Sequence, residues 1–202
     1  MNSFSFHWNR LLLYVCILLS SSSLYSQKKD QKDQGKQYLS EAKKDVLEYL
    51  SDTVIIKKYG IISNAIWSYA ELGMQEFKSS ALLIKTLEDE GFIIEKGVAG
   101  MPTCFVATWG NGKPVIGILG EYDALPGLSQ KANKPIRDPV VTGAPGHGCG
   151  HNMMGTAGVS AAIAVKKSME QNNLQGTLKF YGSPAEETLI SRPYMVREGV
   201  FN

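Results

Sequence analysis

The second half of the chain alternates short strand-like runs with a long helical pattern, which restricts the fold more than any other feature. The runs FIIEK (92–96), TCFVATW (103–109) and PVIGILG (114–120) are separated by Gly, Asn and Pro. Their β-branched and aromatic residues are typical of strands. A helical pattern over about residues 152–168 and a fourth run, TLKFYG (177–182), follow. This β-α-β order predicts a layered α/β domain.

One of these runs has a distinctive pattern. VIGILG is apolar on both alternating faces, which is typical of a strand covered on both sides. We therefore expect it to be a buried central strand. The next 30 or so residues, between Glu121 and His151, have almost no periodicity. Aperiodic stretches of this length are usually functional or disordered, and this one lies where α/β sheets bind their ligands.

Two helices are expected before the strands. The first begins after an N-cap at Ser51 or Asp52 and is stopped by Gly73, and its apolar positions recur at helical spacing: Ile55, Tyr59, Ile62, Ile66 and Tyr69. The second lies within EFKSSALLIKTLEDEG, with Gly91 as its C-terminal signal and an apolar stripe of Leu82, Leu83 and Leu87.

The composition is that of one globular domain. The chain has 202 residues, of which 44% are hydrophobic and 20% charged, and a chain of this length buries a sizeable core without staples. Its formal net charge is only +2, and its lysines are scattered apart from the run KKDQKDQGK near the start. Because no basic stripe is present, nucleic acid is excluded as a partner.

The N-terminus has the layout of a secretory signal peptide. Residues 1–26 contain a weakly basic start, a short apolar run and a serine-rich exit, and the run is too short for a spanning helix. Residues 27–37 are charged and glutamine-rich, and are expected to be a flexible tether. The folded domain is expected over residues 38–202. We expect an exported protein, periplasmic or extracellular, without a stable membrane span.

The stretch GAPGHGCGHNMMGTAG (143–158) concentrates metal-binding side chains in a glycine-rich loop. It contains His147, Cys149 and His151, followed by a helix of small residues that allows close approach to a sheet. A thiolate and an imidazole two positions apart can converge on one cation. The alternatives are that they only pack or cap the helix, or that Cys149 forms a disulfide with Cys104 in the oxidising compartment.

Two acidic clusters lie at the ends of other predicted strands. Glu121 and Asp123 follow VIGIL and share a face if the chain is extended; the alternative is an exposed acidic turn. Glu186 and Glu187 in FYGSPAEET follow the last strand. The alternative is a purely structural role, because acidic side chains at a helix N-terminus stabilise the helix. An α/β fold gathers these clusters with Cys149 and His151 along one sheet edge. Three ligands to a divalent ion and one spare glutamate as base are typical of metal-assisted hydrolysis.

Four motifs together resemble a known family. AELGMQEFKSSALLIKTLEDEGF, GEYDALPG, GHGCGHN and GSPAEET occur in the order and approximate spacing seen in the M20 metallopeptidase and amidohydrolase family. Within it they are most similar to the branch with aminobenzoyl-glutamate hydrolase and the N-acyl amino acid amidohydrolases. The resemblance extends from about Tyr38 to Asn202. It implies a zinc-peptidase-like α/β catalytic domain with a mixed central sheet flanked by helices.

The resemblance also implies an activity and its residues. The activity is hydrolysis of a small-molecule amide that releases an amino acid from an acyl or aryl partner, with a Zn²⁺ or Mn²⁺ ion. By position, Cys149, His151 and Glu187 are implied to be metal ligands. Asp123 matches an aspartate that steadies the metal site, and Glu121 stands where many relatives have a histidine ligand or another acid.

Further assignments follow from the same resemblance. Glu186 is implied to be the general base, and His147 is expected to support the site. Asn152 stands where many members of this branch have Asp, which leaves the partner of His151 open. Relatives continue into further histidine ligands and a dimerisation domain. We therefore expect a fragment or a truncated relative, inactive as a fragment on its own, and a homodimer at full length. The alternatives are a dipeptidase or carboxypeptidase on this scaffold, or a non-catalytic remnant that binds a metal or ligand.

Overall fold

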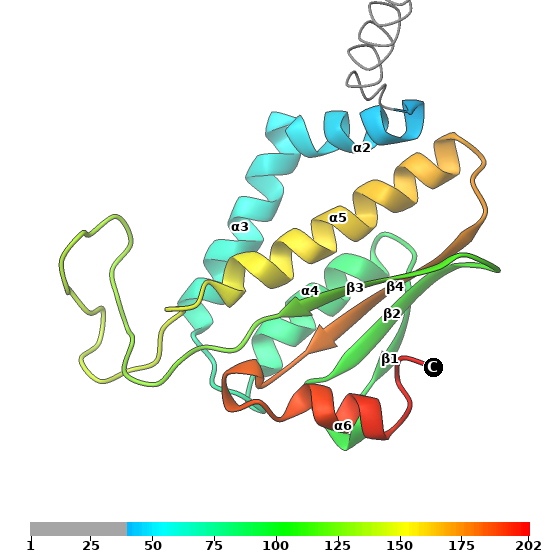
Figure 1. The fold of residues 1–202 in the computed structure, drawn as a ribbon. Helices are drawn as coiled ribbons and strands as arrows, with labels where there is room; N and C mark the ends of the chain where they lie inside the picture. The colour runs from blue at the N-terminus through cyan, green and yellow to red at the C-terminus, as the bar shows by residue number, and fades with distance from the viewer. Residues whose placement is uncertain (1–39) are drawn as a thin grey trace, which may run out of the picture. The chain divides into compact units, whose positions relative to one another are not determined.

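Four strands form a mixed sheet in the order β1-β2-β4-β3 in the computed structural model, which describes residues 40–202 (Figure 1). The predicted signal peptide and tether lie outside the described residues. The elements are α2 (Glu41–Ser51), α3 (Thr53–Tyr69), α4 (Phe77–Glu88), β1 (Ile93–Lys96), η1 (Val98–Gly100), β2 (Phe105–Asn111), β3 (Val115–Glu121), α5 (His151–Gln171), β4 (Gly176–Ser183), η2 (Glu186–Thr188) and α6 (Ser191–Arg197). The predicted α/β architecture with a mixed sheet flanked by helices is confirmed.

Strand pairing places the ends of β3 and β4 side by side. β1 with β2, and β2 with β4, are antiparallel, whereas β3 and β4 run parallel with Glu121 paired to Ser183. Because both strands end at the same sheet edge, the segments that follow them begin as neighbours. α5 connects these two strands, as the β-α-β prediction requires.

The prediction that VIGILG forms a central strand is wrong. Within residues 40–202, β3 pairs with β4 alone and lies at the edge of the sheet. Val115 and Ile116 are 52% and 50% exposed. An apolar run does not specify how many strands pair with its backbone. Here β4 lies between β2 and β3, which leaves β3 at the edge with half-exposed apolar side chains.

The two faces of the sheet have separate apolar clusters. Phe105 of β2 and Phe180 of β4 pack with α3, α4 and α5, whereas Val106 and Tyr181 point to the opposite face with Met195 of α6. This division follows from the alternation of side chains along a strand. The three long helices thus cover one face and α6 packs on the other (Figure 1).

The two predicted helices are present as α3 and α4, but they end at other residues than the sequence predicted. Asp52 caps α3, since its carboxylate accepts hydrogen bonds from the backbone amides of Val54 and Ile55. The helix ends at Tyr69 with Ala70 in the left-handed region, so Gly73 is not its stop. Helix α2 (Glu41–Ser51) is present in addition to the helices predicted from the sequence.

The small residues of α5 allow the close approach that the sequence predicts. A Cβ atom on Gly155 would lie only 2.5 Å from the backbone oxygen of Glu121. Glycine here brings the first turns of α5 against the end of β3, which places His151 beside the acidic segment.

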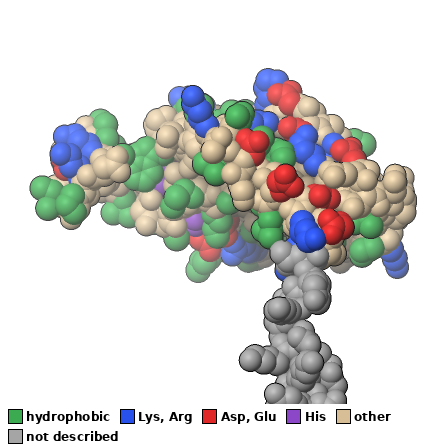
Figure 2. Space-filling view, turned by 90° about the horizontal axis from the view of Figure 1, so that it is seen from above, with side chains coloured by type: hydrophobic (Ala, Val, Ile, Leu, Met, Phe, Trp, Pro, Cys, Tyr) green, Lys and Arg blue, Asp and Glu red, His purple; other side chains and the backbone are tan. Residues whose placement is uncertain are grey.

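The surface is of mixed charge. Lys and Arg side chains lie among Asp and Glu side chains on the face shown in Figure 2. No helix within residues 40–202 is long and apolar enough to cross a membrane.

Candidate metal centre

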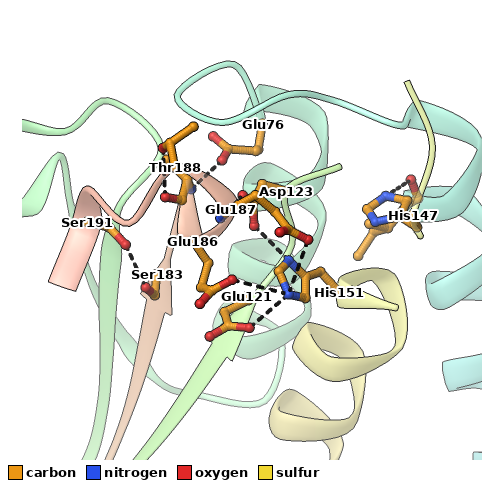
Figure 3. Close-up of polar contacts among 12 residues, drawn as sticks. Glu76, Glu121, Asp123, His147, His151, Ser183, Glu186, Glu187, Thr188 and Ser191 are labelled. Atoms are coloured by element: carbon orange, nitrogen blue, oxygen red, sulfur yellow. Dashed lines mark hydrogen bonds and ion pairs between the residues drawn. The ribbon is translucent and has the colours of Figure 1, made fainter. Parts of the chain in front are cut away.

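Side chains from three separate segments meet at the shared end of β3 and β4 (Figure 3). Glu121 ends β3, His151 begins α5, and Glu186 and Glu187 form the turn η2 after β4. No helix or strand lies between Glu121 and His151, as predicted. The fold therefore brings together clusters that are far apart in sequence.

His151 lies at the centre of this group and is 1% exposed. Its Nε2 atom lies 3.1 Å from Glu121 Oε2, 3.8 Å from Glu186 Oε2 and 4.0 Å from Glu187 Oε1. Burial lowers the pKa of His151, but the hydrogen bond and charge of Asp123, with the charges of Glu187 and Glu186, outweigh this effect and raise it. A single ring nitrogen thus faces three carboxylates.

Asp123 connects the imidazole to the acidic turn. It is 1% exposed, and its Oδ1 lies 2.8 Å from His151 Nδ1 while its Oδ2 accepts a hydrogen bond of 3.0 Å from the Glu187 amide. The contact to Nδ1 leaves Nε2 directed at the carboxylates. Asp123 is therefore the hydrogen-bonding partner of His151 that the sequence left open.

Two groups of side chains have the spacing of metal ligands. One comprises Cys149, His151 and Glu187, and the other Glu121, His151 and Glu186; in each, one ligand atom per residue lies within 4.8 Å of the others. Glu187 Oε1 is buried and has no hydrogen-bond partner. Because a buried carboxylate oxygen without a partner is costly, its position in the first group fits a cation.

Cys149 contributes an exposed thiol, and both Cys104 and Cys149 are free. The disulfide considered from the sequence is therefore absent from the structure. Desolvation of the sulfur, the negative charge of Glu187 together with a hydrogen bond to its carboxylate, and the charge of Glu186 all raise the pKa of the Cys149 thiol. A cation beside these groups would reverse that electrostatic penalty and favour the thiolate.

The acidic side chains also contact Arg192, a residue that the sequence pattern did not indicate. Arg192 of α6 forms ion pairs with Glu121 and, at 3.4 Å, with Glu186 Oε1. Glu121 is 3% exposed, so a paired guanidinium offsets part of the cost of burying its charge. Arg192 lies in a helix of only 7 residues, and no sequence spacing indicated its contacts.

Two predicted supporting residues lie outside both ligand groups. His147 Nε2 lies 3.1 Å from the backbone oxygen of Ile66, and Figure 3 shows this ring apart from the acidic side chains. Burial lowers the pKa of His147. Asn152 donates to Ser63 Oγ at 3.0 Å and so attaches α5 to α3.

Glu76, at the start of α4, is a second residue that sequence reasoning missed. Its side chain is fully buried, and its two oxygens accept hydrogen bonds from Thr103 and from the backbone amide of Ala185. Burial raises the pKa of Glu76, and these hydrogen bonds oppose the change. An acidic residue before a helix resembles ordinary capping, so no separate signal marked this position.

The chain is similar to known proteins of one family. Residues 117–202 match the model of peptidase family M20/M25/M40. The chain is 45% identical over 160 residues to a subunit of p-aminobenzoyl-glutamate hydrolase from Escherichia coli, a match covering 78% of this chain and 33% of that protein. It is 30% identical over 157 residues to the Xaa-Arg dipeptidase of Mus musculus, covering 72% and 32%.

A solved structure supports the same relationship. The YXEP protein of Bacillus subtilis, described as a dinuclear metal-binding peptidase of the M20 family, superimposes with a TM-score of 0.62 at 26% identity. The match covers 75% of this chain and 41% of that one. The chain spans about a third of the length of the curated relatives it matches. The part of the chain covered by these matches belongs to the M20 peptidase family.

Proposed function

We propose that this protein is a metal-dependent amidohydrolase that cleaves the amide bond of an N-acyl or aminobenzoyl amino acid. One observation carries the proposal: the buried Glu187 Oε1 atom, which has no hydrogen-bond partner, faces His151 Nε2 at 4.0 Å within a Cys-His-Glu group. This arrangement is unfavourable for a resting carboxylate and suits a ligand.

The donor set fits a borderline divalent ion. Sulfur, nitrogen and oxygen donors from Cys149, His151 and Glu187 are ligands that Zn²⁺ accepts in proteins, and the carboxylates also suit Mn²⁺. The second group, with Glu121 and Glu186, shares only His151 with the first. When bound, the ion supplies Lewis acidity that polarises a carbonyl and activates water.

The remaining groups suit proton transfer and orientation. The Glu186 side chain is 23% exposed, so a water molecule can reach its carboxylate. We assign Glu186 as the base that takes a proton from that water and returns it to the departing amine. Asp123 orients His151, and Arg192, which contacts Glu121 and Glu186, limits repulsion between these acids.

The proposed substrate class follows from similarity to two relatives with different substrates. Similarity to the aminobenzoyl-glutamate hydrolase is higher than similarity to the Xaa-Arg dipeptidase, which favours an aryl or acyl amino acid over a dipeptide. We also propose that the protein is exported, from the pattern of residues 1–26, and that it is a homodimer at full length.

Replacement of one side chain tests the assignment. In the full-length protein, Glu186→Gln is expected to lower hydrolysis of p-aminobenzoyl-glutamate by about 10²- to 10⁴-fold. It should leave bound metal, measured by elemental analysis after dialysis, unchanged. Glu198→Gln, an exposed glutamate paired only with Arg197 among the ion pairs of residues 40–202, is the matched control and should retain full activity.

Other outcomes point to other functions. Loss of both metal and activity in Glu186→Gln would give Glu186 a structural role. Hydrolysis of Xaa-Arg dipeptides, but not of p-aminobenzoyl-glutamate, would favour the dipeptidase. Metal binding without hydrolysis of either substrate would favour a non-catalytic binding protein.

A further inference from the structure

Glu76 is a buried carboxylate that the proposed reaction does not use. Its side chain is 0% exposed. Oε1 accepts a hydrogen bond of 2.8 Å from the backbone amide of Ala185, and Oε2 accepts one of 2.7 Å from Thr103 Oγ1. A carboxylate this deeply buried needs partners for its oxygens. Glu76 therefore holds both the Thr103 hydroxyl and the amide of Ala185, the residue immediately before Glu186.

Thr103 extends this connection to the end of β3. Its backbone oxygen accepts a hydrogen bond of 2.6 Å from the Tyr122 hydroxyl. Tyr122 is 0% exposed and stands between Glu121 and Asp123 in the chain. The path from Ala185 through Glu76 and Thr103 to Tyr122 thus connects the two segments that carry the site's acids.

The backbone around Glu76 contacts the same two segments. The backbone oxygen of Glu71 accepts a hydrogen bond of 2.8 Å from the backbone amide of Ala124. Gly73 lies so close to Ala185 that a Cβ on the glycine would be 2.9 Å from the Ala185 Cβ. Ala185 has φ of 52°, in the left-handed region that residues with a side chain rarely adopt. Its conformation therefore depends on neighbours that hold it.

We propose that Glu76 is a positioning residue that holds segments 121–124 and 185–187 in fixed relation to each other. It contacts none of the ligand groups directly and acts through the Ala185 amide and Thr103. The inference rests on the proposed function only for its effect on metal binding, because the effect on the two segments follows from the hydrogen bonds themselves.

Hydrogen–deuterium exchange of the metal-free protein tests this role. Glu76→Met keeps the side chain's length but removes both acceptors, and it should speed exchange selectively in peptides covering 121–125 and 184–189. Glu76→Gln keeps an oxygen for the Ala185 amide and should preserve most of the protection. Thr177→Val is the matched control. Thr177 is buried at the end of β4 far from the site, and its hydroxyl donates a hydrogen bond to the backbone oxygen of Gly112.

The control separates positioning from general stability. Thr177→Val should lower stability without selective exchange in these two segments. Unchanged exchange at 184–189 in Glu76→Met would overturn the inference. Faster exchange spread evenly over the chain, as expected of a merely destabilising change, would overturn it as well.

Cobalt binding adds a readout at the site. If the proposed function holds, Glu76→Met should weaken Co²⁺ affinity about 10- to 100-fold and alter the thiolate-to-cobalt absorption band, whereas Glu76→Gln should restore both. If the unmodified protein binds no Co²⁺, the proposed function fails, and the exchange experiment alone decides the role of Glu76.

Discussion

Asp123 and His151 share a buried contact of 2.8 Å between Oδ1 and Nδ1, and both side chains are almost completely excluded from water. The second oxygen of the same carboxylate accepts a hydrogen bond from the backbone amide of Glu187. One side chain thus fixes both an imidazole and the turn that carries two glutamates. Loss of the Asp123 charge should therefore weaken metal binding more than it lowers the stability of the fold.

Asp123→Asn tests this relationship. The amide can present an oxygen to only one donor, so its NH₂ group must face either His151 or the Glu187 amide. We expect Zn²⁺ affinity, measured by isothermal titration, to fall about 10- to 100-fold. Asp89→Asn, which alters an exposed pair with Lys85, should change the affinity little. Equal affinities in the two variants would contradict the role of Asp123.

The two cysteines within residues 40–202 should differ in reactivity. Burial raises the pKa of the Cys104 thiol to about 12, so this thiol should resist alkylation in the folded protein. Cys149 is exposed and should react with iodoacetamide in the metal-free protein, then be protected by Zn²⁺. Mass spectrometry of labelled peptides measures both sites, and Cys149→Ala identifies the reactive one. Labelling of Cys149 that Zn²⁺ does not slow would argue against a ligand role.

Much of the fold could be predicted because local patterns determine it. The change from helical to strand periodicity placed β1 to β4 near their observed bounds, and the small residues of α5 indicated its close approach to the sheet. The edge position of β3 was not predictable, since it depends on where β4 pairs and not on the side chains of β3.

The site was predictable to the level of its segments. Acids and metal-binding side chains at strand ends indicated that Glu121, His151 and Glu186 would meet, because parallel strands end at one edge. The partners of each side chain required coordinates. Arg192 and Glu76 lie in stretches whose local pattern is that of ordinary surface and capping residues. Only the packing brings Arg192 to the acids and Glu76 to the Ala185 amide.

The approach of α5 to β3 gives a prediction with an internal control. A Cβ on Gly155 would meet the Glu121 backbone oxygen, whereas one on Gly60 in α3 would have nothing within 4 Å. Gly155→Ala should destabilise the protein by about 1–3 kcal/mol through overpacking and weaken Zn²⁺ binding. Gly60→Ala should stabilise it by up to about 1 kcal/mol. Urea unfolding measures both, and similar effects of the two changes would contradict the packing described.

An ion-paired carboxylate away from the site predicts a pH dependence of stability. Glu90 lies 3.2 Å from Lys58 Nζ and 2.8 Å from Lys167 Nζ, and so connects α3 with α5. Burial favours a higher pKa for Glu90, but the hydrogen bonds and charges of Lys167 and Lys58 outweigh it and hold the pKa below its usual value. Because the folded state binds this proton less tightly than the unfolded state, the stabilisation is present above the unfolded pKa.

That stabilisation should be lost as the pH falls through the lowered pKa of Glu90 in the folded protein. Glu90→Gln should therefore cost about 1 kcal/mol or less near neutral pH, and its difference from the unmodified protein should disappear in acid. Glu41→Gln, which removes an exposed pair with Lys44, is the control and should show little difference at any pH. Urea unfolding from pH 3 to pH 7 gives both curves. A Glu90→Gln penalty that stayed constant over this range would show that the lost stability comes from packing and not from the charge of Glu90.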